Sequence, residues 1–206
     1  MLRLYFADVS ALEPDAYAEP LTNYRRGKLD RQRNPQSRRQ SLGAELLLRQ
    51  ALADCAPDRP WPPEIRPGVN GKPDWDVEGL YFNLSHSGEI AACVIADRPV
   101  GLDVQEESEY RAALARRFFA PEEQAYLAAS AEPEHAFGRI WALKESYVKA
   151  LGNGLTMPLA SFSVAGVGRE RPDAAFWYRR IGAYHFAVCV PGAAAAAPEI
   201  IENKLP

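Results

Sequence analysis

The chain has 206 residues, of which 47% are hydrophobic and 25% are charged, a composition typical of a globular protein rather than a disordered one. Its apolar runs are far shorter than the ~18 residues of a membrane span, and the first residues do not resemble a signal peptide, so we expect a cytoplasmic protein without membrane association. The three cysteines, Cys55, Cys93 and Cys189, are too widely spaced for a disulfide framework or a CxxC zinc site. They favour a reducing compartment.

The net charge of −3 is unevenly distributed. Residues 25–39 contain seven basic residues and one acidic residue, so this segment carries +6 and leaves −9 for the rest of the chain. A segment of this kind attracts anions. Nucleic acid is one candidate anion, but the net acidity of the whole chain argues against a general nucleic-acid binder.

The first half of the chain is predicted to mix helices and strands. Two helices, at about 21–33 and 36–54, follow a first strand at 2–9. Prolines between 57 and 67 predict a loop, and Gly71, Lys72 and Pro73 form part of a turn. Two further strands are expected at 80–85 and 90–96.

The second half repeats this order of elements without a repeat at the level of residues. The predicted elements are a strand at 100–104, a helix beginning near Pro121, a helix over about 134–151 that ends at Gly152, and strands at 161–167, 174–180 and 184–190. Residues from 193 onward are expected to be a loosely attached terminus. The pattern predicts an α+β fold with two similar halves, 1–98 and 99–206.

The helix that contains IWALKESYVKALGNG has two distinct faces. Apolar residues at helical spacing form one stripe, whereas Trp141, Glu145 and Lys149 lie one turn apart on another face. Read on its own, the Glu145–Lys149 pair is an ordinary surface ion pair. Lys144 falls within the apolar stripe, where an ammonium needs an anionic partner or a route to solvent.

Two other segments carry candidate site residues. Asp103 ends the apolar strand of PVGLDVQEE, where a carboxylate can be a ligand of Mg²⁺ or simply part of a turn. Ser85 and His86 lie in FNLSHSG, between two strands, where they form a polar turn or a binding loop. No hydrolase motif accompanies them. His135 and His185 stand alone in the sequence and are interpreted as structural.

The order and spacing of FNLSHSG, VGLD, FFAPEE and WALKESYVKALGNGL resemble the Sfp-type 4′-phosphopantetheinyl transferases. The resemblance is close over residues 71 to about 164 and looser on either side. It implies transfer of the phosphopantetheine arm of coenzyme A to a serine of an acyl or peptidyl carrier protein, with release of 3′,5′-ADP. It also implies a pseudo-dimer of two α+β halves in one chain, with the coenzyme in the cleft between them.

The resemblance assigns a role to each candidate residue. Asp103 and Glu145 match the ligands of Mg²⁺, which Mn²⁺ can replace, and Gln105 stands where many members have a third acid. Lys149 matches the lysine that contacts the pyrophosphate, and Lys144 is expected to support it. The proton of the attacking serine would pass to Glu123 or Glu145.

The coenzyme-binding residues that the resemblance implies come from the whole first half. Ser85 and His86 are expected at the phosphates and Gly71, Lys72 and Pro73 at the adenine and ribose, whereas the 3′-phosphate would be held by Arg25, Lys28 and Arg39. Carrier proteins are expected to dock on apolar residues of the second half, around Phe118, Phe119 and Tyr126.

Two alternative functions remain at this point. One is a catalytically silent module that binds coenzyme A or a carrier protein, although such a module would not need Asp103, Glu145 and Lys149 together. The other is a nucleic-acid binder that uses residues 25–39, for which the lack of interleaved aromatic residues is unfavourable. We therefore expect a monomeric transferase that has no nucleic-acid partner.

Overall fold

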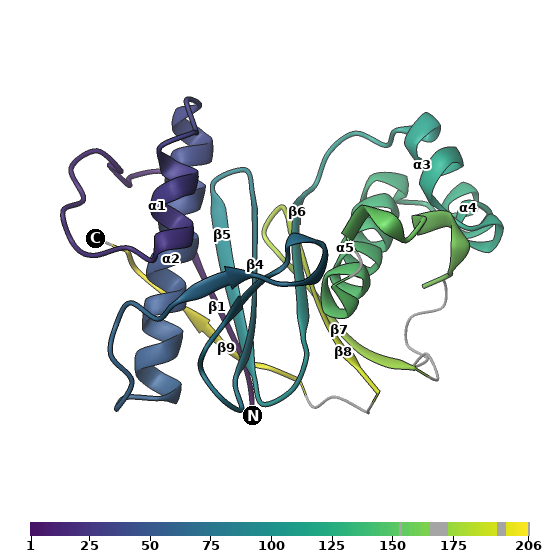
Figure 1. Ribbon diagram of the computed structural model, residues 1–206. Helices are drawn as coiled ribbons and strands as arrows, with labels where there is room; N and C mark the ends of the chain where they lie inside the picture. Colours follow the sequence, from purple (N-terminus) through teal and green to yellow (C-terminus); the bar gives the residue numbers. More distant parts are fainter. Residues whose placement is uncertain (153, 165–172, 193–196, 206) are drawn as a thin grey trace.

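The structure is a computed structural model that describes residues 1–152, 154–164, 173–192 and 197–205. The first half of the chain builds a four-stranded sheet of order β4-β5-β1-β9 with the long helix α2 packed on it (Figure 1). The strands are β1 (Leu2–Asp8), β4 (Tyr81–Ser87), β5 (Ile90–Ala96) and β9 (Glu199–Glu202). The other elements of this half are α1 (Asn23–Leu29), α2 (Pro35–Cys55), the 3₁₀ turn Val69–Gly71 and the small pair β2 (Ile65–Pro67) and β3 (Pro73–Trp75).

The second half builds a three-stranded sheet of order β6-β8-β7 that carries α5. Its elements are β6 (Gly101–Glu106), α3 (Ala112–Phe118), α4 (Pro121–Ala128), α5 (Pro133–Leu151), 3₁₀ turns at Gly154–Thr156 and Leu159–Ser161, β7 (Ala174–Ile181) and β8 (Tyr184–Pro191). Proline in the first turn starts both α4 and α5, because proline there gives up no helical hydrogen bond.

The helices and sheets stack in four layers, in the order α2, first sheet, second sheet, α5 (Figure 1). Leu4 and Tyr5 are neighbours on β1 but belong to different apolar clusters, because successive side chains of a strand point to opposite faces. Tyr5 packs in the cluster that includes α2, whereas Leu4 packs between the sheets in the cluster that includes Phe186 of β8. On the outer face of the second sheet, Ala187 of β8 packs in the cluster of α5.

Side chains of β4 connect the two sheets. The amides of Leu102 and Val104 on β6 donate to Asn83 Oδ1 at 2.9 Å and to Ser85 Oγ at 3.1 Å, and Ser87 Oγ accepts from the amide of Glu106 at 2.9 Å. Alternate residues of a strand share a face, so the FNLSHS pattern supplies a row of acceptors to alternate amides of β6. These hydrogen bonds fix how β6 is aligned along β4, and they therefore fix the position of Asp103.

A glycine lets α5 approach the start of β6 closely. A Cβ atom at Gly101 would lie 2.1 Å from the carbonyl oxygen of Ser146 and 2.3 Å from the amide nitrogen of Ala150. Any larger residue would push the helix away from the strand. Gly101 therefore sets the distance between Asp103 on β6 and the helix that carries Glu145 and Lys149.

The α+β fold and its main elements agree with the sequence-based expectation, but several details differ. The elements α3, β2 and β3 were not expected. The strand expected at 161–167 is not formed over residues 161–164, and residues 165–167 lie outside the described residues. Within the part of the chain that the structure describes, no helix is long and apolar enough to cross a membrane.

The expectation of a loosely attached terminus is wrong for residues 199–202. These residues form β9, which pairs in parallel with β1 from Arg3 to Phe6. The outer edge of β1 would otherwise leave backbone amides and carbonyls unpaired, and β9 satisfies them. The end of the chain thus returns to the sheet of the first half, while residues 193–196 lie outside the described residues.

Candidate functional site

A cavity of about 280 Å³ lies between α1, β4 and the C-terminal end of α5. Its walls hold the cations Arg25, Lys28, Lys72 and Lys149, together with His86. The first three cations and His86 come from the first half of the chain, and Lys149 comes from the second. The cavity is therefore a positively charged site built by both halves, which suits a ligand with several negative charges.

Lys149 connects this cavity to a buried carboxylate. Its Nζ lies 2.6 Å from Asp103 Oδ1 and 3.1 Å from Ser85 Oγ, and the Ser85 hydroxyl donates to the same Asp103 oxygen at 3.1 Å. Asp103 is 8% exposed at its side chain, whereas Lys149 is 29% exposed. A residue from β4, one from β6 and one from α5 thus meet at one point.

Burial raises the pKa of both carboxyl groups at this point. For Asp103 the loss of water raises the pKa, and the opposing charge of Lys149 lowers it in part. For Glu145, burial is again the main cause, and the neighbouring charge of Asp103 raises the pKa further. Two carboxyl groups with raised pKa values would be stabilised in their charged forms by positive charge in addition to that of Lys149.

The residues around Asp103 fit a hard divalent cation. Asp103 Oδ2 is buried and has no hydrogen-bond partner among the described residues. Glu145 is close enough for the charge of Asp103 to act on it, and Gln105 is two positions beyond Asp103 on β6, on the same face of the strand. Carboxylate and amide oxygens are the ligands that Mg²⁺ prefers.

The basic side of the cavity is built on a buried ion pair. Glu45 of α2 accepts the amide of Thr22 through Oε1 at 2.6 Å and pairs with Arg25 Nε through Oε2 at 3.4 Å. Arg25 and Glu45 are 3% and 1% exposed, so the arginine is held in one orientation. Lys28 lies one turn further along α1, with its Nζ 4.9 Å from the centre of the Tyr24 ring.

His86 is the neutral member of this cavity. Partial desolvation, and then the charges of Lys149, Arg25 and Lys28, lower the pKa of His86 to about 4. The ring is therefore uncharged at neutral pH. It can donate a hydrogen bond to a bound anion without adding to the charge of the cavity.

Gly71, Lys72 and Pro73, the residues expected at the adenine and ribose, also line the cavity. Lys72 donates to the carbonyl oxygen of Val100 at 3.0 Å and to that of Ala150 at 3.4 Å. Burial lowers the pKa of this ammonium. Its two acceptors lie just before β6 and near the end of α5, so Lys72 also ties this loop to the second half of the chain.

Glu123 and Lys144 pair with each other and do not line this cavity. Both side chains are fully buried, and Lys144 Nζ lies 2.8 Å from Glu123 Oε2. Glu123 also accepts the amides of Ala120 at 2.7 Å and Val164 at 2.6 Å. The expectation that Lys144 needs an anionic partner is confirmed, and the geometry favours a structural role for this pair.

Arg39 is separated from the other expected coenzyme-binding residues. It lines a different cavity, which also contains Arg33 and Arg38, and it pairs with Glu89 at 3.5 Å. Arg38 bonds to the carbonyl oxygen of Leu29 and pairs with Asp15. The basic segment 25–39 is thus divided between two sites, and only Arg25 and Lys28 reach the cavity that holds Lys149.

Several residues of the site were not found from the sequence. Asn70 and Asn83 line the cavity, and Glu45 holds Arg25. Glu45 falls within the apolar stripe of α2, and its pairing with Arg25 depends on how α1 crosses α2. A glutamate at a position where burial is expected is the signal that could have indicated a basic partner.

Comparisons with known proteins identify the family of this chain. Residues 99–195 match the 4′-phosphopantetheinyl transferase superfamily. The chain is 36% identical over 124 residues to the 4′-phosphopantetheinyl transferase gsp of Aneurinibacillus migulanus, which covers 59% of this chain and 52% of that protein. It is 31% identical over 173 residues to a 4′-phosphopantetheinyl transferase of Bacillus subtilis, which covers 80% and 77%.

A third relative is the 4′-phosphopantetheinyl transferase Sfp of Bacillus subtilis strain 168, 36% identical over 105 residues, or 48% of this chain and 47% of that protein. The chain thus spans about half the length of gsp and Sfp and more than three quarters of the second relative. The resemblance deduced from the motifs is confirmed. These sequence comparisons show that the chain belongs to the 4′-phosphopantetheinyl transferase superfamily and, within it, to the Sfp-type family.

Proposed function

We propose that this chain transfers the 4′-phosphopantetheine group of coenzyme A to a serine of an acyl or peptidyl carrier protein, in a reaction that depends on Mg²⁺ and releases 3′,5′-ADP. The observation that carries the proposal is the contact between Lys149 and Asp103 at the wall of a cationic cavity. The membership of the family supports the same reaction.

The cavity is suited to the charge of the proposed substrate. Coenzyme A carries a pyrophosphate and a 3′-phosphate, and Arg25, Lys28 and Lys149 would offset these charges from several sides. Lys149 can turn from Asp103 toward a phosphate oxygen because part of its side chain is exposed. Arg25 is held by Glu45 and would meet a phosphate in a fixed orientation.

In the proposed reaction the serine oxygen attacks the phosphorus atom that bears the pantetheine arm. A new O–P bond forms, the bond from that phosphorus to the oxygen of the 5′-phosphate breaks, and 3′,5′-ADP leaves with the bonding electrons. Lys149 would stabilise the negative charge that develops on the leaving phosphate. The proton of the serine must pass to a base.

Asp103, Glu145 and Gln105 would hold the metal ion. When bound, Mg²⁺ would supply charge neutralisation at the pyrophosphate during transfer. The unpartnered Oδ2 atom of Asp103 and the raised pKa of Glu145 support this assignment. Gln105 would contribute an oxygen without a charge, so this chain would hold the ion less tightly than a member with three acids.

Glu145 is the better candidate for the base. Its side chain is only partly buried and lies beside the proposed metal site, where the charge of Asp103 acts on it. Glu123 is fully buried, and both its oxygens accept bonds from Ala120, Lys144 and Val164. A serine from a carrier protein would have no path to it without local opening.

Further parts of the proposal concern the architecture and the partners. The two α-on-sheet halves would form a pseudo-dimer with the coenzyme at their junction, because the cavity draws residues from both. One chain then suffices for a complete site, so we propose a monomer. None of the thiols of Cys55, Cys93 and Cys189 is in a disulfide, which suits the cytoplasm.

A nucleic-acid partner is not part of this proposal. A nucleic-acid face needs several basic side chains on one surface. Here Arg25 is buried against Glu45, Arg38 pairs with Asp15 and Arg39 with Glu89. Three of the seven basic residues of segment 25–39 are therefore paired with acidic residues of the same chain.

The test is to incubate the protein with coenzyme A, Mg²⁺ and a panel of apo acyl and peptidyl carrier proteins, and to read the carriers by intact mass. We expect a gain of one phosphopantetheine group per carrier. Asp103→Asn should abolish the gain because it removes the charge that faces Lys149. Glu122→Gln, which changes an exposed acid of α4, is the control and should keep full transfer.

Each other outcome has a distinct meaning. Saturable binding of coenzyme A without any gain of mass would favour a silent binding module. Absence of coenzyme A binding would contradict the proposal as a whole. Equal transfer by Asp103→Asn and the unchanged protein would contradict the assignment of the site but not the activity.

A further inference from the structure

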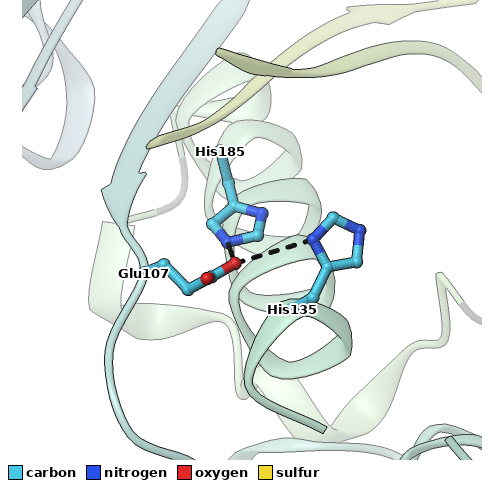
Figure 2. Close-up of side chains that lie close together, drawn as sticks. All are labelled: Glu107, His135 and His185. Carbon is cyan, nitrogen blue, oxygen red and sulfur yellow. Dashed lines mark ion pairs between the residues drawn. The ribbon is translucent and has the colours of Figure 1, made fainter. Parts of the chain in front are cut away.

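Three side chains from distant parts of the sequence meet in the second half of the chain (Figure 2). Glu107 directly follows β6, His135 lies in the first turn of α5, and His185 lies on β8. Figure 2 shows one carboxylate oxygen of Glu107 facing a nitrogen of each imidazole ring. The ring of His185 is fully buried, whereas Glu107 and His135 are partly exposed at 24% and 28% of their side chains.

The facing atoms have the spacing of metal ligands. His185 Nε2 lies 3.3 Å and His135 Nδ1 lies 3.7 Å from Glu107 Oε2, and the three ligand atoms all lie within 4.8 Å of one another. Two ligands bound tetrahedrally at ~2.0–2.1 Å from a zinc ion are about 3.4 Å apart. The observed separations thus leave room for an ion at the centre after small adjustments.

These same three atoms lack hydrogen bonds. Glu107 Oε2, His135 Nδ1 and His185 Nε2 are all buried, and none has a hydrogen-bond partner within the described residues. Buried polar atoms without partners are rare because each one costs the hydration that it has lost. Three that converge on one point indicate a missing partner that all three share.

The other ring nitrogen of His185 already has a partner. Its Nδ1 lies 2.8 Å from the hydroxyl of Tyr178. With the proton on Nδ1, the Nε2 lone pair would face a carboxylate oxygen, an arrangement that a cation between them would stabilise.

Neighbouring residues hold the group in place. Tyr178 fixes the far nitrogen of His185, and Arg180 Nη2 donates to Glu107 Oε1 at 2.8 Å, which leaves Oε2 for the centre of the cluster. A Cβ atom at Gly138 would lie 2.4 Å from His185 Nε2, so glycine at this position makes the space for the ring. Partners of this kind orient the ligands of known metal sites.

We propose that Glu107, His135 and His185 form a metal site for a divalent transition ion of the zinc class, separate from the site at Asp103. Two imidazole nitrogens and one carboxylate suit Zn²⁺ and its neighbours, whereas Mg²⁺ prefers oxygen ligands alone. Glu107 lies four residues beyond Asp103, or ~13 Å along an extended chain. The proposal does not depend on the transferase activity.

A bound ion would join three elements of the second half. It would connect the end of β6, the start of α5 and β8, and α5 carries Glu145 and Lys149 at its other end. The ion would therefore hold α5 against the sheet on which Asp103 lies. Three protein ligands leave at least one coordination position for water.

The test measures metal binding directly. Untagged protein is treated with a chelator, dialysed and titrated with Zn²⁺ by calorimetry in the absence of coenzyme A and Mg²⁺, and its metal content is determined by mass spectrometry. We expect one equivalent of Zn²⁺ per chain. His135→Ala and Glu107→Gln should each weaken the affinity at least tenfold, and Tyr178→Phe, which keeps all three ligands, by about tenfold.

Two control variants distinguish Zn²⁺ binding at this site from binding at His86 or Asp103. His86→Ala and Asp103→Asn should bind Zn²⁺ as the unchanged protein does. Because the chain has only three histidines, the imidazole NMR signals provide a second readout, in which His135 and His185 shift with Zn²⁺ and His86 does not. Circular dichroism confirms that each variant is folded.

Three results would overturn the proposal. They are the absence of a stoichiometric Zn²⁺ site in the unchanged protein, the same affinity in folded His135→Ala and Glu107→Gln, and a Zn²⁺ shift that appears at His86. If either ligand variant does not fold, Tyr178→Phe and the NMR assignment decide the question. In that case equal affinity in Tyr178→Phe together with unshifted His135 and His185 signals would contradict the site.

Discussion

The ammonium group of Lys149 can pair with Asp103 or with a phosphate in the cavity. It lies 2.6 Å from Asp103 Oδ1 and neutralises part of the charge of a buried carboxylate, and it also lines the cavity where the phosphates are proposed to bind. In the free protein the pair with Asp103 dominates. Once cations and phosphates enter, Asp103 would no longer need Lys149, and the ammonium would become available to the substrate.

Replacement of Lys149 tests this double role. We expect Lys149→Ala to lower the rate of phosphopantetheine transfer about 10²- to 10³-fold, the usual loss when one donor to a developing negative charge is removed. The rate is measured by intact mass of the carrier at saturating coenzyme A. Lys204→Ala changes an exposed lysine and is the control. A loss below threefold would show that Lys149 does not act on the leaving group.

Replacement of Gln105 tests its proposed role as a ligand of Mg²⁺. Gln105→Glu adds a negative charge on the same face of β6 as Asp103, and it should lower the Mg²⁺ concentration required for half-maximal transfer. The measurement is the Mg²⁺ dependence of the transfer rate. Gln50→Glu adds the same charge at an exposed position of α2 and should leave this dependence unchanged. An unchanged or higher requirement in Gln105→Glu would contradict the assigned role.

An ion pair between Glu123 and Lys144 joins α4 to α5. Lys144 Nζ bonds to the carbonyl oxygens of Leu159 at 2.8 Å and Phe162 at 2.5 Å, in addition to its contact with Glu123. Glu123 closes the N-terminus of α4 and accepts the amide of Val164. The pair therefore joins two helices to the segment that follows α5.

Loss of this pair should affect stability and leave the chemistry intact. Glu123→Gln keeps an acceptor but leaves the charge of Lys144 buried, so we expect the free energy of unfolding to fall by about 3–5 kcal/mol. Denaturant unfolding measures this change. The transfer rate per folded molecule should stay within threefold of the unchanged protein.

Glu122→Gln, at the neighbouring exposed position, is the matched control for both measurements. A rate that falls a hundredfold while the stability is unchanged would restore Glu123 as the base. A stability loss without a rate loss would leave Glu145 as the remaining candidate.

The amphipathic pattern of α5 shows what could be predicted from the sequence. The positions of Glu145 and Lys149 on one face and of Lys144 in the apolar stripe follow from helical spacing alone. The identity of the partner of Lys144 could not be predicted, because it depends on how α4 folds back across α5. For this reason Glu123 is included among the candidate bases predicted from the sequence.

Other elements escaped prediction for a similar reason. β9 is a short segment whose formation depends on the open edge of β1, and the sequence around residue 200 does not encode that edge. Arg39 lies on α2 with its neighbours in helical register, but it reaches a different cavity from Arg25. Glu107, His135 and His185 have no sequence spacing that could reveal their contact, which arises only when β6, α5 and β8 are assembled.

At the scale of the whole molecule, the charge of the cavity is a property of both halves. Arg25 and Lys28 come from α1 and Lys149 from α5, and all three act on His86. His86 therefore reports the electrostatic potential at the junction of the halves. Burial is the main cause of the lowered pKa of His86, and these three cations lower it further, as expected of a cavity that attracts anions.

Binding of 3′,5′-ADP should raise the pKa of His86. Its phosphates would offset the three cations, so the pKa should move from about 4 toward the ordinary value of 6.5 for histidine. Between these two values the complex binds more protons at His86 than the free protein does, so binding takes up protons in this range. An NMR titration of the His86 ring with and without saturating 3′,5′-ADP measures the shift directly, which avoids the separate titration of the phosphates.

Removal of one cation distinguishes electrostatic causes from burial. Lys149→Ala should raise the pKa of His86 in the free protein, because Lys149 is the charge that lowers it most, whereas Lys204→Ala should leave it near 4. A pKa that stays near 4 in Lys149→Ala and with bound 3′,5′-ADP would mean that desolvation alone controls His86. The cavity would then not be the place where the halves combine their charges, and the proposed position of the coenzyme between them would be wrong.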